Sequence, residues 1–387
     1  MTTAVDARKA LIDLLSIQAP APVVAHLDGR EWAGLLCLAR QHRLTPLLHW
    51  RLTREKRAGA IPEDIRKSFA KDFKDSTLRA LAARRELILT SKILAGAAIP
   101  SAALKGAFLA FHAYPHPALR PSRDIDLLVP REKALRAYEI LQRAGFRRIE
   151  EHTLDPEYCL DSARHLPPLM PPSGALRVEL HARLTLPRES ATGWENGVWE
   201  RLIERPSAGQ TLRYLSPTDL LLHLIVHAAY EHRFDNGPLI LSDLDYLIRG
   251  EKIDWTLFWN LACEGGWTKG CELLLKLTGR LHGASLPGIP DASIPEFDAL
   301  ALMLRDTKLN YAARLAGRLS GRSPLQKLSL LFRGALPSQS VGMTPRYWAA
   351  RAKRVASRVP TLLSSARHPA ARENAEALAR LERWLST

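Results

Sequence analysis

The sequence predicts a mixed α+β protein that is rich in helices. Residues 1–96 carry apolar side chains at helical spacing almost throughout. Short apolar runs that are typical of strands appear only between residues 97 and 184, and helical patterns return from residue 216 onward. A small sheet that lies between two helical regions is the arrangement that buries both kinds of element.

The N-terminal region, residues 1–96, is expected to form a helical cap. Asp28 is suited to cap a helix, because its carboxylate can accept hydrogen bonds from free backbone amides. Pro62 and the two acids that follow it open a long amphipathic helix, and Gly96 is a suitable residue to end it. We expect a short strand over residues 97–99.

The next region, residues 97–215, contains the acidic strand on which the functional argument depends. Residues 124–129 read Asp-Ile-Asp-Leu-Leu-Val, and alternation along a strand places Asp124 and Asp126 on one face. Buried carboxylates are costly without a cation, so a divalent metal such as Mg²⁺ is the simplest partner. The alternative is that these acids face water or pair with Arg120 and Arg123.

Two further stretches of this region carry candidate functional groups. Lys105 and Gly106 stand at a helix start whose amides could cradle phosphate, and Lys105, Arg120 and Arg123 supply positive charge. In residues 176–184 strict alternation places Glu179 and His181 on one strand face. Glu179 is the candidate third carboxylate, unless this is the exposed polar face of an edge strand. The proline-rich residues 155–175 are expected to form a surface loop or lid.

Residues 216–300 are expected to form a helical domain on the substrate or nucleotide side. The helix that Ser216 caps carries four polar residues at i+4 spacing on one face, and they are Asp219, His223, His227 and Glu231. This face could bind a metal, but such histidines are more often structural. We assign His227, with His181, to the substrate cleft. Asp243 and Asp245 stand at i,i+2 on a helix, so they do not predict a metal pair.

Charge separates the last region, residues 301–387, from the rest. The protein has 387 residues and a net charge of +15, and residues 301–387 hold 16 Lys and Arg against 4 Asp and Glu. The first 300 residues are therefore almost neutral, which argues against a nucleic-acid footprint over the whole body. Basic and aromatic side chains alternate in residues 343–358, so we expect a basic helical region that packs on the body or meets an anionic partner.

Composition also predicts the compartment. The four cysteines show no zinc-type spacing, the N-terminus lacks a secretory pattern, and no apolar run approaches the roughly 20 residues of a transmembrane helix. We therefore expect a cytoplasmic protein without a transmembrane segment.

Four motifs together resemble one protein family: Leu104-Lys105-Gly106, Arg120-Pro121, Asp124 to Val129, and Val178-Glu179-Leu180-His181. They are similar to the motifs of a bacterial group called "nucleotidyltransferase family protein", within the polymerase-beta-type superfamily. The resemblance covers roughly residues 20–290. It implies a small nucleotidyltransferase sheet with helical N-terminal and C-terminal regions.

The resemblance also implies an activity, which is metal-dependent transfer of a nucleoside monophosphate from an NTP such as ATP to a hydroxyl group. The acceptor is a small molecule, a peptide or a protein. Asp124, Asp126 and Glu179 would hold two Mg²⁺ ions, or Mn²⁺, and Lys105, Gly106, Arg120 and Arg123 would bind the phosphates. The wider superfamily has Ser or Gly after the helix-start Gly, whereas here Ala107 follows Gly106. The phosphate contact then falls to Lys105, or the donor differs.

Two alternatives remain. The same metal site could transfer another phosphate-linked group, such as a sugar phosphate, in natural-product or polysaccharide tailoring. Alternatively, the protein is a non-catalytic regulator that binds nucleic acid or another anion. Such a protein would not be stabilised against thermal unfolding by Mg²⁺ and nucleotide together.

Overall fold

The computed structural model of the chain forms two compact units: Met1–Glu231 with Pro238–Ala292, and His232–Gly237 with Ser293–Thr387. Each is described by itself. The structure describes residues 7–16, 27–54, 61–149, 154–186, 193–283, 295–305 and 369–386.

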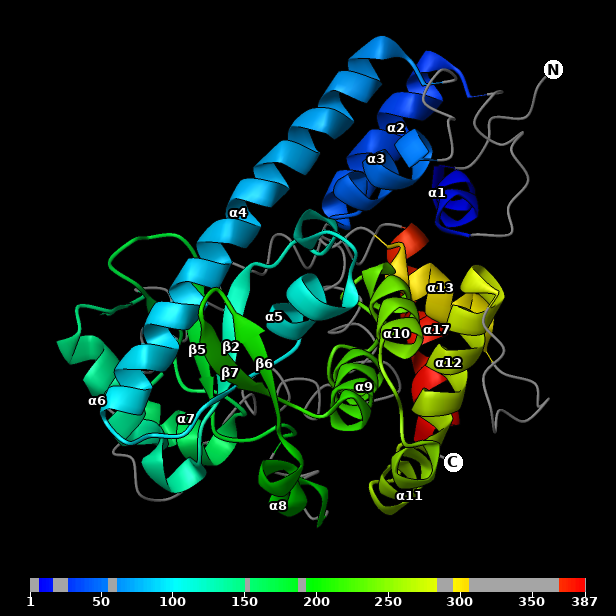
Figure 1. Cartoon of the computed structure of the whole chain (residues 1–387). Coiled ribbons are helices and arrows are strands. Elements are labelled where there is room, and N and C mark those ends of the chain that lie inside the picture. Colours follow the sequence, from blue (N-terminus) through cyan, green and yellow to red (C-terminus); the bar gives the residue numbers. More distant parts are fainter. Residues whose placement is uncertain are drawn as a thin grey trace, which may run out of the picture. The chain divides into compact units, whose positions relative to one another are not determined.

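The first unit begins with helices, as predicted: α1 (Ala7–Leu15), α2 (Gly29–Gln41), α3 (Thr45–Arg54) and α4 (Glu63–Gly96). Asp28 caps α2 through the amides of Arg30 and Glu31, and the Glu31 carboxylate accepts the Asp28 amide in return. The 34-residue helix α4 packs against α3 and also passes over the sheet (Figure 1). Helix α4 ends at Gly96, the residue that the sequence indicates.

A mixed seven-stranded sheet follows, and it confirms the predicted α+β class. The strands have the spatial order β3-β4-β5-β2-β1-β7-β6. The two long central strands, β2 and β5, run parallel and bury most of their side chains on both faces (Figure 1). The bounds are β1 (Ala102–Ala103), β2 (Asp124–Leu128), β3 (Arg147–Arg148), β4 (Leu169–Met170), β5 (Arg177–His181), β6 (Ile203–Ser207) and β7 (Gln210–Tyr214).

Two expectations about this region are wrong, and one alternative is excluded. Residues 97–99 form no strand, because α4 ends in a turn and the short strand β1 begins at Ala102. Residues 155–175 are not simply a loop, since they include α7 (Pro156–Ser162) and strand β4. Strand β5 is not an edge strand, because it pairs with β4 on one side and β2 on the other.

The hairpin of β6 and β7 is a feature that the sequence reading missed. Ala208 and Gly209 form its two-residue turn with φ values of 47° and 79°. Positive φ at both turn residues matches the right-handed twist of antiparallel strands, and glycine adopts it without strain.

Helices cover the sheet and complete the first unit. The short helix α5 (Gly106–Phe108) continues directly into the π-helix η3 (Leu109–Ala113). Ser216 caps α9 (Pro217–Val226), as predicted, and the chain then continues as the π-helix η7 (His227–Glu231). The remaining helices are α6 (Ala134–Arg143), α8 (Gly193–Val198), α10 (Leu239–Gly250), α11 (Trp255–Glu264) and α12 (Thr268–His282).

The described part of the second unit contains helices α13 (Glu296–Met303) and α17 (Pro369–Ser386). They pack together, with Leu378 and Leu381 buried and Arg380 paired with Asp298 at 2.7 Å. The basic residues 343–358 lie outside the described residues, so their anionic partner stays a prediction.

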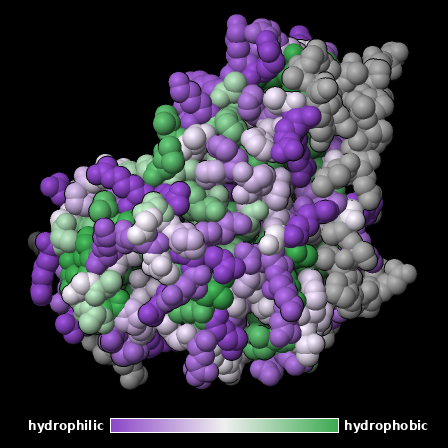
Figure 2. All heavy atoms as spheres, viewed as in Figure 1, coloured by the Kyte–Doolittle hydropathy of each residue, from purple (hydrophilic) through white to green (hydrophobic). Residues whose placement is uncertain are grey.

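The surface mixes polar and apolar side chains. Helix α4 exposes Leu78, Leu81 and Leu89. Figure 2 shows that hydrophobic residues on this face lie in small groups among hydrophilic ones. Among the helices that the structure describes, none combines the length and the apolar character that a bilayer span requires.

Candidate functional site

The candidate site lies on one face of the two central strands. Strands β2 and β5 are paired in register, with Asp124 opposite Arg177, Asp126 opposite Glu179 and Leu128 opposite His181. Residues in register on neighbouring strands point to the same face, and so do residues two apart on one strand. The pairing therefore brings Asp126, Glu179 and His181 together, although Asp126 and Glu179 are 53 positions apart in the sequence.

Asp126 is a buried and ionised carboxylate. Its Oδ1 atom lies 2.8 Å from Nε2 of His181 and 3.4 Å from Nζ of Lys105. Burial by itself would raise the pKa of Asp126, but the Lys105 ammonium and the hydrogen bond from His181 hold this pKa well below its usual range. Burial and the Lys105 charge lower the pKa of His181 to about 3, so this imidazole is neutral near pH 7.

Glu179 and Asp124 share one cation. The Arg177 guanidinium lies 3.4 Å from Oε1 of Glu179 and 3.2 Å from Oδ2 of Asp124. Nε2 of His165 lies 3.6 Å from the other Glu179 oxygen. Burial raises the pKa of Glu179, His165 opposes this shift, and the charges of Asp126 and Asp124 add to it. Asp124 thus pairs with Arg177 rather than with Arg120 or Arg123, which the alternative reading had named.

Three of these side chains form a group that could hold a metal ion. Ligand atoms of Asp126, Glu179 and His181 all lie within 4.8 Å of one another. Two carboxylates and one neutral imidazole are a suitable donor set for a divalent cation. Asp124, the first of the three predicted ligands, lies outside this group, and its side chain is 31% exposed. His181, which we had assigned to the substrate cleft, lies inside it.

The Lys105-Gly106 pair is held against strand β2. The amide of Leu104 donates to the Asp126 carbonyl at 3.0 Å, so Lys105 starts helix α5 beside the acidic group. Lys105 has a φ of 43°, a backbone conformation that is uncommon for a residue with a side chain. A Cβ atom on Gly106 would meet the Ser122 hydroxyl oxygen at 2.5 Å, so this position requires glycine.

Arg120 is fixed by a buried ion pair. Its Nε atom donates to Asp243 on α10 at 2.8 Å, and the Tyr114 hydroxyl donates to the same carboxylate oxygen at 2.8 Å. Arg43 lies nearby and donates to the Pro121 carbonyl at 3.3 Å. Burial, followed by the charges of Arg120 and Arg123, lowers the pKa of Arg43 to about 10. The loop before β2 is therefore a region of concentrated positive charge.

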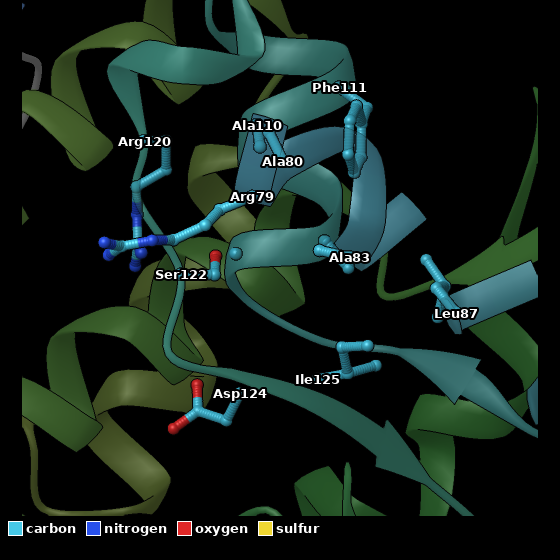
Figure 3. A pocket seen from close by; sticks show the side chains of 12 residues that line it. Arg79, Ala80, Ala83, Leu87, Ala110, Phe111, Arg120, Ser122, Asp124 and Ile125 are labelled. Atoms are coloured by element: carbon cyan, nitrogen blue, oxygen red, sulfur yellow. The ribbon is translucent and has the colours of Figure 1, made fainter. Parts of the chain in front are cut away.

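A pocket opens beside this loop, between helix α4 and the start of β2 (Figure 3). Arg79, Arg120 and the Ser122 hydroxyl lie at its polar end, with Asp124 at the edge (Figure 3). The rest of its wall is apolar apart from the Gly106 backbone, and its other side chains are Ala80, Ala83, Leu87, Ala107, Ala110, Phe111 and Ile125. The pocket is therefore polar at the end near Arg79 and Arg120 and apolar along the rest of its wall.

The predicted histidine face of α9 lies close to the same strands. His223 is fully buried, and burial, then the charges of Lys105 and His181, keep its pKa well below the usual value. His227 follows at a ring distance of 6.0 Å, at the start of the π-helix. Glu231 instead forms a buried ion pair with Arg164, so the four residues do not act as one ligand set.

Among the site residues that were not predicted, three show why sequence patterns miss them. His165 lies in the proline-rich segment, and only its β-bridge to His181 brings it to Glu179. Asp243 was not assigned to the site because its i,i+2 spacing with Asp245 excludes a shared helix face. That spacing gives no information about its ion pair with Arg120, which is 123 positions away in the sequence. Arg79 looks like any exposed charge on an amphipathic helix, and no sequence signal distinguishes it.

Comparison with known proteins agrees with this geometry. The model of a family described as uncharacterised nucleotidyltransferase matches residues 28–283, which include every element of the site. No matching protein was found among those with curated functions, and no matching solved structure was found. The matched region is more than half of the chain, and the chain therefore belongs to this family of uncharacterised nucleotidyltransferases.

Proposed function

We propose that the protein transfers a nucleoside monophosphate from a nucleoside triphosphate to a hydroxyl group of an acceptor, with a divalent metal bound at Asp126 and Glu179. The observation that carries this proposal is the meeting of these two acids and His181 on the central strands, in a chain of the nucleotidyltransferase family.

The residues fit such a metal. Asp126 is ionised although it is buried, and Nδ1 of His181 is buried without a hydrogen-bond partner in the described part of the chain. A bound divalent ion would neutralise charge on the triphosphate and lower the pKa of the acceptor hydroxyl. Asp124 stands next to the group on the same strand face. Asp124 could become a third carboxylate ligand if its ion pair with Arg177 broke. The two-metal arrangement of the polymerase-beta-type superfamily requires such a third carboxylate.

Basic residues on the other side of Asp126 would bind the donor phosphates. Lys105 reaches Asp126, and Asp243 holds Arg120 in one orientation. A guanidinium that is already fixed loses little entropy when it binds an anion. We therefore assign phosphate binding to Lys105, Arg120, the backbone at Gly106 and the exposed Arg123. The Ser122 hydroxyl next to Gly106 takes the place of the serine that this sequence lacks after the glycine.

One observation favours the non-catalytic alternative, namely that the chain's own cations already neutralise the acids. Lys105 lies beside Asp126, and Arg177 lies between Asp124 and Glu179. A regulator would keep these pairs when anions bind, whereas an enzyme would exchange them for metal and phosphate.

The test is a transfer assay with the full-length chain. Each of the four ribonucleoside triphosphates, labelled at the α-phosphate, is incubated with Mg²⁺ or Mn²⁺ and a set of hydroxyl acceptors, and products are identified by mass spectrometry. The proposal predicts pyrophosphate and an acceptor that is heavier by one nucleoside monophosphate. An acceptor that gains a sugar phosphate from a sugar nucleotide instead would favour the second donor class. Loss of the product in Asp126→Asn, but not in Asp161→Asn, assigns the activity to this site, since Asp161 is an exposed surface acid.

A further inference from the structure

We propose that His165 and His181 both contribute imidazole nitrogens to the metal site, so that it takes a first-row transition ion such as Mn²⁺ in preference to Mg²⁺. The inference rests on the proposed function in one respect, which is that Asp126 and Glu179 hold a metal. It adds a ligand, His165, and a class of metal.

The backbone explains how His165 reaches the site. His165 and His181 form an antiparallel bridge, and the next amide, that of Leu166, donates to the Leu180 carbonyl at 2.9 Å. These bonds fix the segment beside β5, and the two imidazole rings lie 5.2 Å apart. Nε2 of His165 then faces Glu179 at 3.6 Å.

The hydrogen bond on the far side of His165 sets its tautomer. Nδ1 lies 2.9 Å from the Leu166 carbonyl oxygen, which can only accept, so the proton of the neutral ring is on Nδ1. The lone pair is then on Nε2, the atom that faces Glu179. Histidines that bind metals nearly always donate their other N–H in this way to a carbonyl or a carboxylate. With 29% of its side chain exposed, His165 is also in contact with solvent.

His181 lies on the other side of the acids, and its Nε2 donates to Asp126 while Nδ1 has no hydrogen-bond partner in the described part of the chain. It offers Nε2 to a metal when the ring proton moves to Nδ1, which breaks no other hydrogen bond. Its side chain is 1% exposed, and Nε2 lies 2.8 Å from Oδ1 of Asp126. Two ligand atoms at right angles around an ion, with bonds of about 2.1 Å, lie about 3.0 Å apart. The observed separation is close to this value, so the pair can bind one ion with a small shift.

The resulting donor set is two carboxylates and two imidazoles. Mg²⁺ prefers oxygen ligands and keeps several waters, whereas imidazole suits first-row transition ions. A site for Mg²⁺ alone would gain nothing from two imidazoles, and burying His181 next to the acids costs solvation. The chemistry of the ligands therefore favours a first-row transition ion over Mg²⁺, and Mn²⁺ is the member of that series that serves as the probe.

Metal binding can be tested without any nucleotide. The full-length protein is freed of metal with a chelator, Mn²⁺ alone is added, and the bound ion is examined by pulsed electron paramagnetic resonance for coupling to directly bonded ¹⁴N. Titration of the same sample with Mg²⁺ gives the ratio of the Mg²⁺ and Mn²⁺ dissociation constants. The variants are His165→Gln, His181→Gln and both together, with His49→Gln as the control, since His49 packs on Phe73 in the N-terminal helices.

We expect nitrogen coupling in the wild type and in the control, weaker coupling in each single variant, and none in the double variant. The preference for Mn²⁺ over Mg²⁺ should fall by about tenfold in the double variant. Bound Mn²⁺ without nitrogen coupling in the wild type would overturn the inference, and so would failure to bind Mn²⁺. This wild-type result decides the question even if a variant does not fold. A nitrogen-bound metal with no transferase activity would overturn the proposed function alone, and an active enzyme with an all-oxygen site would overturn this inference alone.

Discussion

Nζ of Lys105 lies 3.4 Å from Oδ1 of Asp126, so one lysine neutralises the acid that the proposed metal would also bind. Lys105 and the metal therefore compete for one carboxylate until nucleotide phosphates arrive to bind the ammonium. We expect Lys105→Met to bind Mn²⁺ about tenfold more tightly, because removal of a positive charge a few ångströms away favours a cation. Nucleotide affinity should fall in the same variant.

Calorimetric titration of Lys105→Met with Mn²⁺, and then with nucleotide, measures both effects. Lys67→Met is the matched control, since Lys67 is an exposed lysine of the same unit. Unchanged metal affinity in Lys105→Met would show that the lysine and the metal do not compete for the Asp126 carboxylate.

The acids of the site make a second prediction. Asp126→Asn and Asp124→Asn should each lower the transfer rate by roughly 10²-fold or more, because charge stabilisation in the transition state is lost. Glu179→Gln should reduce kcat more than it raises the KM for nucleotide. Steady-state kinetics of the three variants, with thermal unfolding to confirm the fold, provides the measurement. Near wild-type turnover in Asp124→Asn would leave the site with Asp126, Glu179 and the histidines as its ligands.

The buried pair of Arg120 and Asp243 predicts a large loss of stability. Asp243→Asn leaves a guanidinium with a 12% exposed side chain without its counter-charge, which should cost about 3–5 kcal/mol in the free energy of unfolding. Tyr114→Phe removes one hydrogen bond to the same carboxylate and should cost about 1–2 kcal/mol. Urea unfolding measures both, with Asp161→Asn expected to change stability by less than about 1 kcal/mol. A loss in Asp243→Asn no greater than in Asp161→Asn would contradict the burial of this pair.

His282 predicts how stability depends on pH. Burial and the charges of Arg51 and Arg249 lower the pKa of His282 from 6.5 to about 3. In the unfolded chain, His282 therefore takes up a proton as the pH falls through about 6.5. In the folded chain, it stays neutral until the pH reaches about 3. The stabilisation is complete above pH 6.5 and is lost as the pH falls from 6.5 towards 3.

His282→Asn should therefore flatten the slope of unfolding free energy against pH between 6 and 4, by about 1.4 kcal/mol per pH unit. Unfolding with guanidinium chloride at a series of pH values gives this slope. A His282→Asn slope equal to that of the wild type would show that folding does not lower the pKa of His282.

Much of the fold follows from local patterns, and the residues show why the rest does not. Asp28 and Ser216 identify helix starts because a cap acts on amides two or three residues away. Asp124 and Asp126 predict a shared strand face because the pleat has a period of two. The pairings of His165 with Glu179 and of Arg120 with Asp243 join residues far apart in the sequence, and only the sheet order and helix packing determine them. The β6–β7 hairpin was missed because its Ala-Gly turn is a weaker signal than Asn-Gly.

The measurement that tests the account most directly is nucleotide binding with and without metal. The full-length wild type and Asp126→Asn are titrated calorimetrically with a nucleoside triphosphate, once in Mn²⁺ and once in chelator. The account predicts that metal strengthens nucleotide binding by about tenfold or more in the wild type, and that Asp126→Asn loses this gain. Equal nucleotide affinity in Mn²⁺ and in chelator, or a gain that persists in Asp126→Asn, would contradict a metal-dependent nucleotidyltransferase site at Asp126.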